Sequence, residues 1–561
     1  MTFDLKDYKD KLLFLPLGGS AEIGMNFNLY YYKGKWLVVD CGAGFAEEYL
    51  PGVDLVLPDI SYIVKHRKDI VGMVLTHAHE DHVGAVQYLW EALGCPIYAT
   101  PFTANFVKAK LSGMADDLPN KIHHIKPSSK FKLDPFEIEM VPLCHSAPEM
   151  QALVIKTEYG NVFHTGDWKF DDGPVVGEVN DEDLLRSYGD QGILALIGDS
   201  TNVFNEEYSG SEGKLKESLY ELISSYKKMV VVTTFASNLA RLIALIDIGV
   251  KTGRRIVLCG RSLHRIVAAA KASGYLQDMP PLVDEKNISS YERGSLLVIA
   301  TGCQGEQLAA VTKMAHKNHP RINVVPGDVV IFSSKIIPGN DKKIFAIFNQ
   351  FAKIGVEILT ERDHFVHVSG HPSKKELRRL YELLRPNTVI PVHGEHIHMH
   401  EHAKIAKSMG IKNVLEVENG DVVNLAPDSP PRKVGKVEAG RMAVYGNYLI
   451  KDNSPIFKMR RSLKNDGICV VNIVISKQNK IQLDPVVIAP GYLDDVEDKD
   501  LIVYIQEQIV LSLHNMGLSG KKKSSEIIES VETAIKSRVK TILRQEIDRV
   551  PVIKVIVSLI P

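Results

Sequence analysis

The segment HAHEDH, residues 77–82, concentrates three histidines and two carboxylates in six positions. It follows an apolar run, VGMVLT (71–76), that predicts a buried strand, and it precedes a helix pattern that begins near Val83. A loop held between a strand and a helix can preorganise its side chains, and imidazole and carboxylate are ligands that suit Zn²⁺ or Mn²⁺. The segment therefore predicts a metal site rather than a solvated turn. The predicted ligands are His77, His79, Asp81 and His82.

Later strand ends supply further ligands. PLCHSAPE places His145 after a predicted strand, FHTGDWKF places Asp167 after a predicted hairpin, and VIPVHGEH places His393 after another strand. Polar residues at strand ends are a common α/β arrangement, because the ends meet at one edge of the sheet. Asp167 suits a bridge between two divalent ions, which would activate water and stabilise the attacking and leaving oxygens. The ligand types thus predict a dinuclear hydrolase centre.

The elements that must position these residues show two patterns of secondary structure. Residues 1–205 show short strands separated by turns, including a hairpin over 151–167. Residues 206–360 alternate helix and strand, which is typical of a parallel sheet. The first pattern returns over 361–445, with a helix at 373–385 and a second predicted hairpin, VLEVENGDVVNL (414–425).

The end of the chain predicts a separate small domain. Residues 446–561 contain a strand pair, two helix patterns and a final strand. A linker is expected near 427–455, beginning at Pro427-Asp428-Ser429-Pro430-Pro431. The basic triplet Lys521-Lys522-Lys523 is expected to be a solvated loop.

Length and composition limit the classes of function. A chain of 561 residues exceeds the ~250–300 residues at which one core stops growing, so several domains are expected. The net charge of −1 excludes an overall basic field, and a nucleic-acid partner would need a local groove. Six cysteines without a CxxC pair favour reduced thiols, and no apolar run reaches the ~18–20 residues that span a bilayer. A cytoplasmic protein with no membrane association is expected.

Eight motifs occur together in one order along the chain. They are PLGGSAEIGMN, PGVDLVLPDISY, HTGDWKFD, GDSTN, TFASN, TGCQGE, VSGHPSKKEL and PVHGE. With HAHEDH they resemble the bacterial ribonuclease J family, of the β-CASP nuclease branch of the metallo-β-lactamase fold. The similarity covers residues 11–445, and the C-terminal residues resemble that family's small terminal domain. HxHxDH alone marks a broad superfamily, whereas VSGH followed by PVHG is much more specific.

The resemblance implies an α/β fold and a role for each site residue. The fold would be a metallo-β-lactamase αββα sandwich, an inserted β-CASP α/β domain and a small α+β C-terminal domain. Asp81, Asp199 and His371 would be catalytic, since a histidine steadied by a carboxylate can give a proton to the leaving oxygen. One ion would bind His77, His79 and His145, the other Asp81, His82 and His393, with Asp167 as the bridge.

A 5′-phosphate pocket is also implied by the resemblance. Its residues would be Ser237, Asn238, His367, Ser369 and Gly370. On the residues alone, Ser237 is more simply an ordinary helix N-cap.

Two further groups of residues are ambiguous. Of the histidines between 393 and 402, only His393 is placed in the site. His398 and His402 are four apart and could bind a stray metal, although a polar helix face is the preferred interpretation. The basic residues Arg241, Lys335 and Lys342 are candidates for lining an RNA cleft.

The resemblance implies a ribonuclease that hydrolyses single-stranded RNA, for maturation and decay. It would trim 5′-monophosphorylated ends 5′→3′ and also cut internally. Two divalent ions are implied, Zn²⁺ first and Mn²⁺ or Mg²⁺ as alternatives. A homodimer or homotetramer and RNA-decay partner proteins are expected.

Two alternatives remain. A related hydrolase could act on thioesters, lactones or DNA. The ~150-residue insertion argues against the first two substrates, but 2′-hydroxyl contacts that would exclude DNA are invisible in a sequence. A scaffold subunit with a decayed site is disfavoured, because all seven predicted metal ligands, Asp199 and His371 are present.

Overall fold

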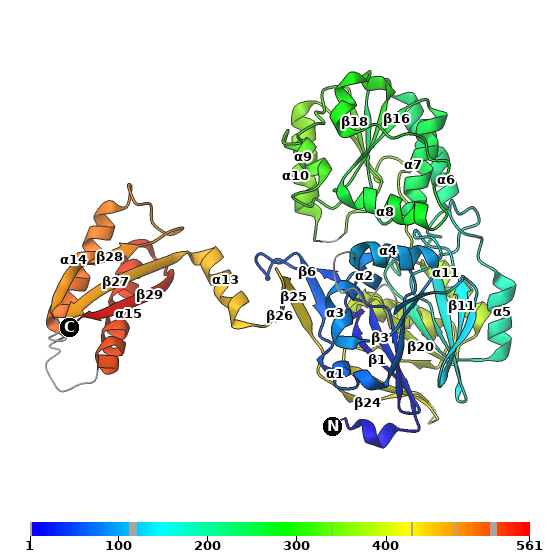
Figure 1. Ribbon diagram of the computed structural model, residues 1–561, viewed down its shortest axis with the longest axis horizontal. Helices are drawn as coiled ribbons and strands as arrows, with labels where there is room; N and C mark the ends of the chain where they lie inside the picture. Colours follow the sequence, from blue (N-terminus) through cyan, green and yellow to red (C-terminus); the bar gives the residue numbers. More distant parts are fainter. Residues whose placement is uncertain are drawn as a thin grey trace. The chain divides into compact units, whose positions relative to one another are not determined.

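The computed structural model describes residues 3–111, 121–337, 339–427, 430–476, 480–516 and 524–560. The chain forms two compact units (Figure 1). The first comprises Met1–Phe45 and Leu55–Met442, and the second comprises Ala46–Asp54 and Ala443–Pro561. The sequence did not suggest that Ala46–Asp54 belongs with the C-terminal residues. Lys521–Lys523 and residues 428–429 of the expected linker lie outside the described residues.

Two sheets form the base of the first unit. The eight-stranded sheet has the order β24 (Arg432–Lys436), β23 (Asp421–Ala426), β1 (Leu12–Gly18), β3 (Phe27–Tyr32), β4 (Lys35–Val39), β7 (Ile70–Val74), β8 (Ile97–Ala99) and β9 (Ile122–His124). The seven-stranded sheet has the order β10 (Lys130–Leu133), β11 (Phe136–Pro142), β12 (Gln151–Thr157), β13 (Gly160–His164), β14 (Ile193–Asp199), β20 (Thr388–Val392) and β22 (Asn413–Val414).

A shared apolar core joins these two sheets. Phe14, Leu37 and Val74 of the first sheet and Leu153 and Ile197 of the second belong to one buried cluster. Burial of such side chains is the main stabilising contribution to the packing.

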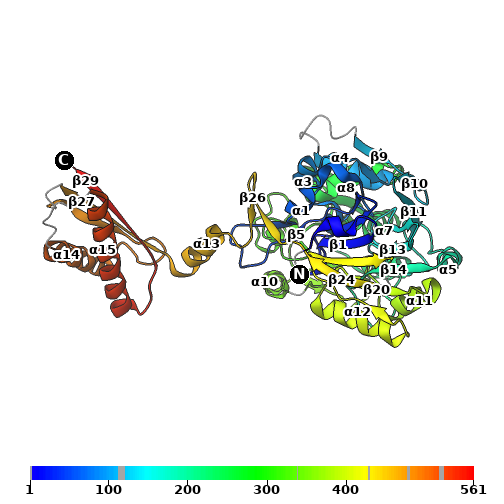
Figure 2. The same cartoon turned by 90° about the horizontal axis from the view of Figure 1, so that it is seen from below.

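Helices cover the outer faces of both sheets (Figure 2). Beside the eight-stranded sheet lie α1 (Ser61–Val64), α3 (Val86–Leu93) and α4 (Pro101–Leu111). A second core holds α5 (Glu182–Gln191), α11 (Lys374–Leu384) and α12 (His396–Ser408) against the seven-stranded sheet. The layers form the αββα sandwich that the family resemblance implies.

A five-stranded parallel sheet is inserted between β14 and β20. Its order is β16 (Arg255–Cys259), β17 (Leu296–Ala300), β15 (Val230–Thr233), β18 (Val329–Phe332) and β19 (Glu357–Leu359). Its helices are α6 (Glu212–Ser225), α7 (Leu239–Lys251), α8 (Arg261–Ala272), α9 (Ala310–Ala315) and α10 (Asp341–Ile354). The near-continuous burial of these strands is expected of a parallel sheet covered on both faces.

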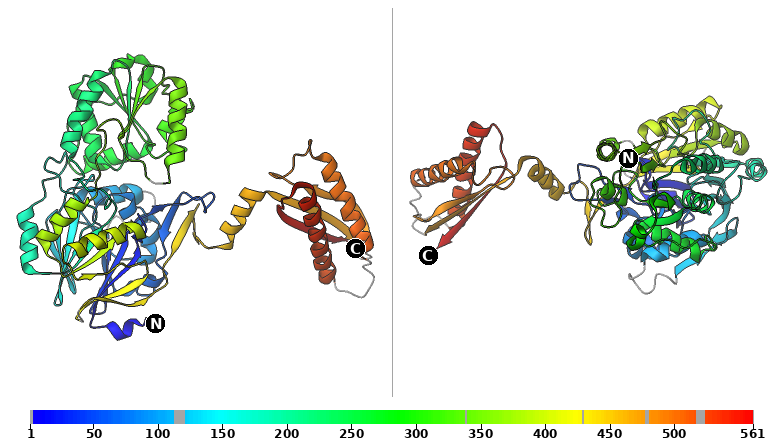
Figure 3. Two further views of the ribbon diagram at one scale, coloured as in Figure 1. Left: turned by 180° about the vertical axis from the view of Figure 1, so that it is seen from behind. Right: turned by 90° about the horizontal axis from the view of Figure 1, so that it is seen from above.

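The second unit has a core of its own. Its three-stranded sheet has the order β28 (Ile481–Ile488), β27 (Ile468–Ser476) and β29 (Val552–Ile560). The helices α14 (Lys499–Asn515) and α15 (Ser524–Ile547) pack on one face of this sheet, and α13 (Pro455–Asp466) precedes it (Figure 3). The strand pair, two helices and final strand were all predicted.

The hairpin predicted over 414–425 is wrong. β22 pairs with β20 in the seven-stranded sheet, whereas β23 pairs with β1 and β24 in the eight-stranded sheet. The apolar pattern identified both strands, but it carries no information about the partner of each. The chain between them passes from one sheet of the sandwich to the other.

Among the described residues, no helix combines the length and the apolar character needed to cross a membrane.

Candidate active site

Only residues 77–79 of the HAHEDH segment form the loop after β7, because residues 80–82 already belong to α2 (Glu80–Val83). The helix therefore begins three residues before the expected start near Val83. The segment is fixed by Asp40, which directly follows β4, the parallel neighbour of β7. Asp40 Oδ1 accepts the backbone N–H of Thr76 at 2.8 Å, and its Oδ2 lies 2.7 Å from Nδ1 of His82. This contact leaves Nε2 of His82 for a metal. Sequence reasoning missed Asp40, although it directly follows a strand, as His393 does and His145 nearly does.

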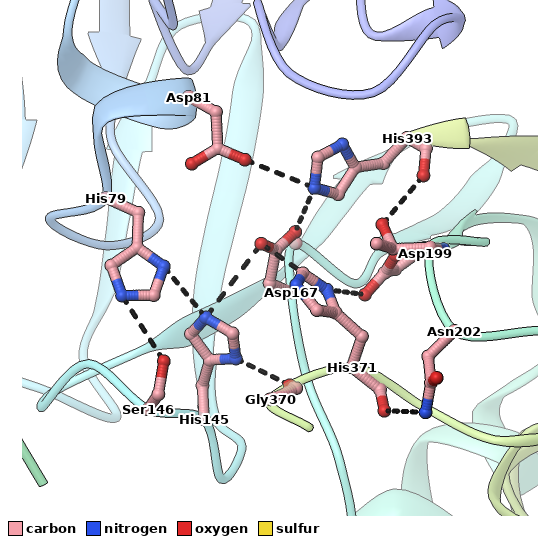
Figure 4. A network of polar contacts seen from close by, with 12 residues as sticks. His79, Asp81, His145, Ser146, Asp167, Asp199, Asn202, Gly370, His371 and His393 are labelled. Carbon is pink, nitrogen blue, oxygen red and sulfur yellow. Dashed lines mark hydrogen bonds and ion pairs between the residues drawn. The ribbon is translucent and has the colours of Figure 1, made fainter. Parts of the chain in front are cut away.

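The seven predicted ligands come together in two sets that share Asp167. Figure 4 shows His79, Asp81, His145, Asp167 and His393 of these sets. Within each set the candidate ligand atoms lie within 4.8 Å of one another. His145 Nε2 is 3.0 Å from His79 Nδ1, and His393 Nε2 is 3.4 Å from Asp167 Oδ1. The first set is His77, His79, His145 and Asp167, and the second is Asp81, His82, Asp167 and His393.

Buried atoms at the centre of the site fit a divalent cation. Both carboxylate oxygens of Asp167 and Nε2 of His77 are buried and form no hydrogen bond within the described residues. Buried polar atoms are nearly always satisfied in folded proteins. Here, their lone pairs converge on the positions that the other ligand atoms surround, and a cation would satisfy them. Imidazole and carboxylate are also the donor set that divalent zinc or manganese prefers.

The two sets differ in their electrostatics. Burial lowers the pKa of His79 to about 4 and lowers the pKa values of His77 and His145 well below the usual range. These rings are neutral, which is the form that binds metal. In the second set, burial opposes protonation, but the carboxylate of Asp167 outweighs it and raises the pKa of His393 to about 10. The second set contains two carboxylates, whereas the first contains only Asp167.

The segment that contains VSGH links the first set to His371 and Asp199. Nδ1 of His145 donates to the carbonyl of Gly370 at 2.6 Å, which turns Nε2 toward the metal position. A Cβ at residue 370 would lie 2.7 Å from Cε1 of His145, so only glycine permits this approach. Gly370 thus touches a metal ligand directly, which the sequence did not indicate.

His371 and Asp199 form the pair that the sequence predicts. Nδ1 of His371 lies 2.8 Å from Oδ2 of Asp199 and 3.7 Å from Oδ2 of Asp167. Burial acts to lower the pKa of His371, but the Asp199 and Asp167 carboxylates outweigh it and raise the pKa above its ordinary value. These contacts hold the ring at the edge of the ligand sets and favour its protonated form.

A buried polar network fixes the backbone of His371. Its carbonyl accepts hydrogen bonds from Ser209 Oγ at 2.6 Å and from Asn202 Nδ2 at 3.3 Å. The buried carboxylate of Glu376 accepts the backbone N–H groups of Phe170 and Ser373. These residues give no sequence signal for the role, because they meet only in the folded chain.

The residues of the predicted phosphate pocket lie on two neighbouring segments. Asn238 is the N-cap of α7 and accepts the N–H of Arg241 at 2.8 Å, so the N-cap interpretation of Ser237 is wrong. Ser369 Oγ accepts the N–H of His371. His367 Nδ1 is buried and forms no hydrogen bond within the described residues. Burial, followed by the charges of Arg241 and other nearby cations, lowers the pKa of His367 well below its usual value.

The structure corrects the role considered for Arg241. Its side chain is fully buried, pairs with Glu212 and donates to the carbonyls of Ser333 and Val366. It cannot line an open RNA cleft, but it ties the start of α7 to the 366–371 segment. Lys335 and Lys342 are exposed.

The polar-face interpretation is wrong for His402. This side chain is fully buried, with Nδ1 2.8 Å from Ser200 Oγ and Nε2 against the hydroxyl of Tyr381. His396 and His400 are exposed and pair with Glu418 and Glu416.

A further cluster in the inserted domain, Cys259, Glu285 and His319, also gathers metal-binding residue types. However, Nδ1 of His319 accepts the backbone N–H groups of Arg321 and Ile322 at 3.3 and 3.0 Å. The neutral ring must therefore carry its proton on Nε2, the nitrogen that faces Cys259. This tautomer does not suit a metal ligand.

Four family models match successive parts of the chain. "Metallo-beta-lactamase superfamily" matches residues 26–197, and "Ribonuclease J, beta-CASP domain" matches residues 227–351. "Zn-dependent metallo-hydrolase RNA specificity domain" matches residues 355–415, and "Ribonuclease J C-terminal domain" matches residues 455–560.

Known proteins are similar over nearly the whole chain. Ribonuclease J of Sinorhizobium meliloti is 36% identical over 533 residues, which cover 94% of this chain and 94% of that protein. Ribonuclease J of Corynebacterium glutamicum is 33% identical over 96% of this chain and 74% of its own length. A solved structure from Enterococcus faecalis V583, of unknown function, has a TM-score of 0.52 at 17% identity and covers 73% of this chain and 99% of that one. The last similarity concerns the fold alone.

Proposed function

The chain belongs to the ribonuclease J family and is a metal-dependent ribonuclease, and from this premise we propose how it acts on RNA. It binds two divalent ions, Zn²⁺ in preference to Mn²⁺ or Mg²⁺. It degrades single-stranded RNA 5′→3′ from 5′-monophosphorylated ends and also cuts internally. The observation that supports this most directly is the pair of ligand sets that share Asp167, with the Asp199–His371 pair beside them.

Each residue has a definite task in this proposal. When bound, the two ions lower the pKa of water and stabilise the charge that develops on the cleaved phosphate. Asp167 holds the two sets together, and Asp40 and Gly370 orient His82 and His145. His371, kept protonated by Asp199, gives a proton to the leaving 3′-oxygen.

The preference for a 5′-monophosphate rests on the predicted phosphate pocket. Ser237 and Asn238 lie at the start of α7, where backbone N–H groups and the helix dipole favour an anion. The positive charges that depress the pKa of His367, including Arg241 and Lys335, favour a phosphate at the same place. We expect a 5′-triphosphate, which carries extra bulk and charge, to bind there less well than a monophosphate. The expected homodimer or homotetramer, the partner proteins and the cytoplasmic location remain predictions from the sequence.

The test uses purified protein with Mn²⁺ or Zn²⁺ and three end-labelled substrates. These are 5′-monophosphorylated RNA, the same RNA with a 5′-triphosphate, and single-stranded DNA. We expect mononucleotides to be released from the 5′ end of the monophosphorylated RNA first, with slower internal cuts in the triphosphorylated RNA. The proposal would be contradicted if DNA were cleaved as fast as RNA. It would also be contradicted if the 5′-monophosphorylated and 5′-triphosphorylated RNAs were degraded at equal rates.

A further inference from the structure

Phe204 is an exposed aromatic residue at the edge of the active site. β14 and β20 run parallel with Asp199 opposite Val392, so both strands end at the same edge of the sheet. Phe204 follows Asp199 by five residues, and His398 follows His393 by the same number. The topology therefore brings both rings to the edge that carries the catalytic pair.

The two rings contact each other. Their centroids are 5.1 Å apart, and their planes are inclined by 60°. His398 is held close to the backbone, because a Cβ at Gly394 would lie 2.8 Å from the Cβ of His398. Its Nδ1 is buried and forms no hydrogen bond within the described residues. Burial lowers the pKa of His398, so the ring supporting Phe204 is neutral.

The exposure of Phe204 does not come from a loose loop. Val203, the residue before it, is fully buried. Asn205, the residue after it, donates its backbone N–H to the carbonyl of Asn202 at 3.0 Å, and its own carbonyl accepts the N–H of Lys374 at 2.9 Å. Even so, 52% of the Phe204 side chain is exposed. An aromatic ring that is fixed in place beside the candidate active site can stack on a ligand with a flat π face.

Lys335 places a positive charge in the same neighbourhood. It is exposed in the loop after β18, and its backbone carbonyl is held by Gln304 Nε2 at 2.8 Å. Its charge acts on the pKa values of both His398 and His367. Lys335 is therefore close enough to act electrostatically on the His398 ring and on the predicted phosphate pocket. An aromatic ring for a base and a cation for a phosphate are the usual elements of a single-strand nucleotide site.

We propose that Phe204, supported by His398, stacks on a nucleobase of the bound single-stranded RNA, and that Lys335 contacts an adjacent phosphate. The contact is indifferent to sequence, because every base has a π face. The inference rests on the proposed function only in that RNA occupies this site. It does not depend on the direction of cleavage or on the preferred 5′ end.

Binding of a 5′-monophosphorylated, phosphorothioate-linked decanucleotide RNA tests the proposal. Fluorescence anisotropy would be measured with the metal-loaded protein. Phe204→Ala should raise Kd at least about fivefold, whereas Phe204→Trp should stay within about twofold of the wild type. Lys335→Ala should reduce the slope of log Kd against the logarithm of the salt concentration by about one. Tyr220→Ala removes another exposed aromatic side chain, on α6, and should leave Kd unchanged.

Abasic nucleotides identify the stacked base. If one base stacks on Phe204, removing that base should abolish most of the effect of Phe204→Ala, while removal of the other bases should leave the effect intact. The metal content of all variants should equal that of the wild type. Wild-type affinity in Phe204→Ala, or an equal effect of Phe204→Ala at every abasic position, would overturn the proposal and leave Phe204 as a contact for another protein. Loss of the 5′-end preference alone would refute the proposed function but not the stacking site.

Discussion

At the scale of single residues, the proposed roles in metal binding and in proton transfer fall on different side chains. Asp81 lies in the second ligand set, with Oδ2 3.3 Å from Nε2 of His393. His371 lies beside the ligand sets, and its Nδ1 is 2.8 Å from Oδ2 of Asp199. The two residues should therefore fail in different ways when they are replaced.

Asp81→Asn and His371→Ala distinguish these two roles. Both should lower RNA cleavage by at least about 100-fold, because each removes a group that acts in the transition state. Only Asp81→Asn should reduce the bound metal, since it removes one of the charges that hold the second ion. Metal content by mass spectrometry and single-turnover cleavage would be measured on the same preparations. Equal loss of metal in both variants would show that His371 is a ligand and not a proton donor.

At the scale of elements, the sequence was informative where a motif ends a strand. All seven ligands follow strands or begin the helix after one, so their types and positions could be read together. Asp40 and Glu376 were missed, and the contact of Gly370 with His145 was not foreseen, because these roles depend on segments far apart in the chain. The error over 414–425 has a related cause: alternation of apolar residues predicts a strand but not its partner. The prediction for His402 was wrong because the spacing of residues along α12 does not show which of its faces is covered by α11.

The segment containing VSGH provides the prediction at this scale. In Gly370→Ala, the new Cβ would lie 2.7 Å from Cε1 and 2.9 Å from Nδ1 of His145, so the ring or the segment must move. Because His145 is a ligand oriented by that segment, metal binding should weaken about 10–100-fold, and cleavage should fall with it. Isothermal titration of the apo protein would measure the affinity. Gly440→Ala is the matched control, since a Cβ there meets no atom within 4 Å, and its affinity should be that of the wild type.

At the scale of the whole molecule, the two compact units have separate cores. All seven candidate ligands, Asp199 and His371 lie in the first unit. The second unit is held by its own cluster, in which Ile535 of α15 is fully buried among the strands β27 and β29 and the helix α14. Units with separate cores can unfold in separate transitions, and damage to one core should leave the other intact.

Ile535→Ala tests this independence. Removing a buried isoleucine side chain down to Cβ should lower the free energy of unfolding of the second unit by about 2–5 kcal/mol. Calorimetry should show one transition moved to lower temperature, with the transition of the first unit and the metal content unchanged. Lys536→Ala, at the exposed neighbouring position of the same helix, should move neither transition. If Ile535→Ala instead lowered both transitions together or released metal, the metal centre would depend on the packing of the second unit.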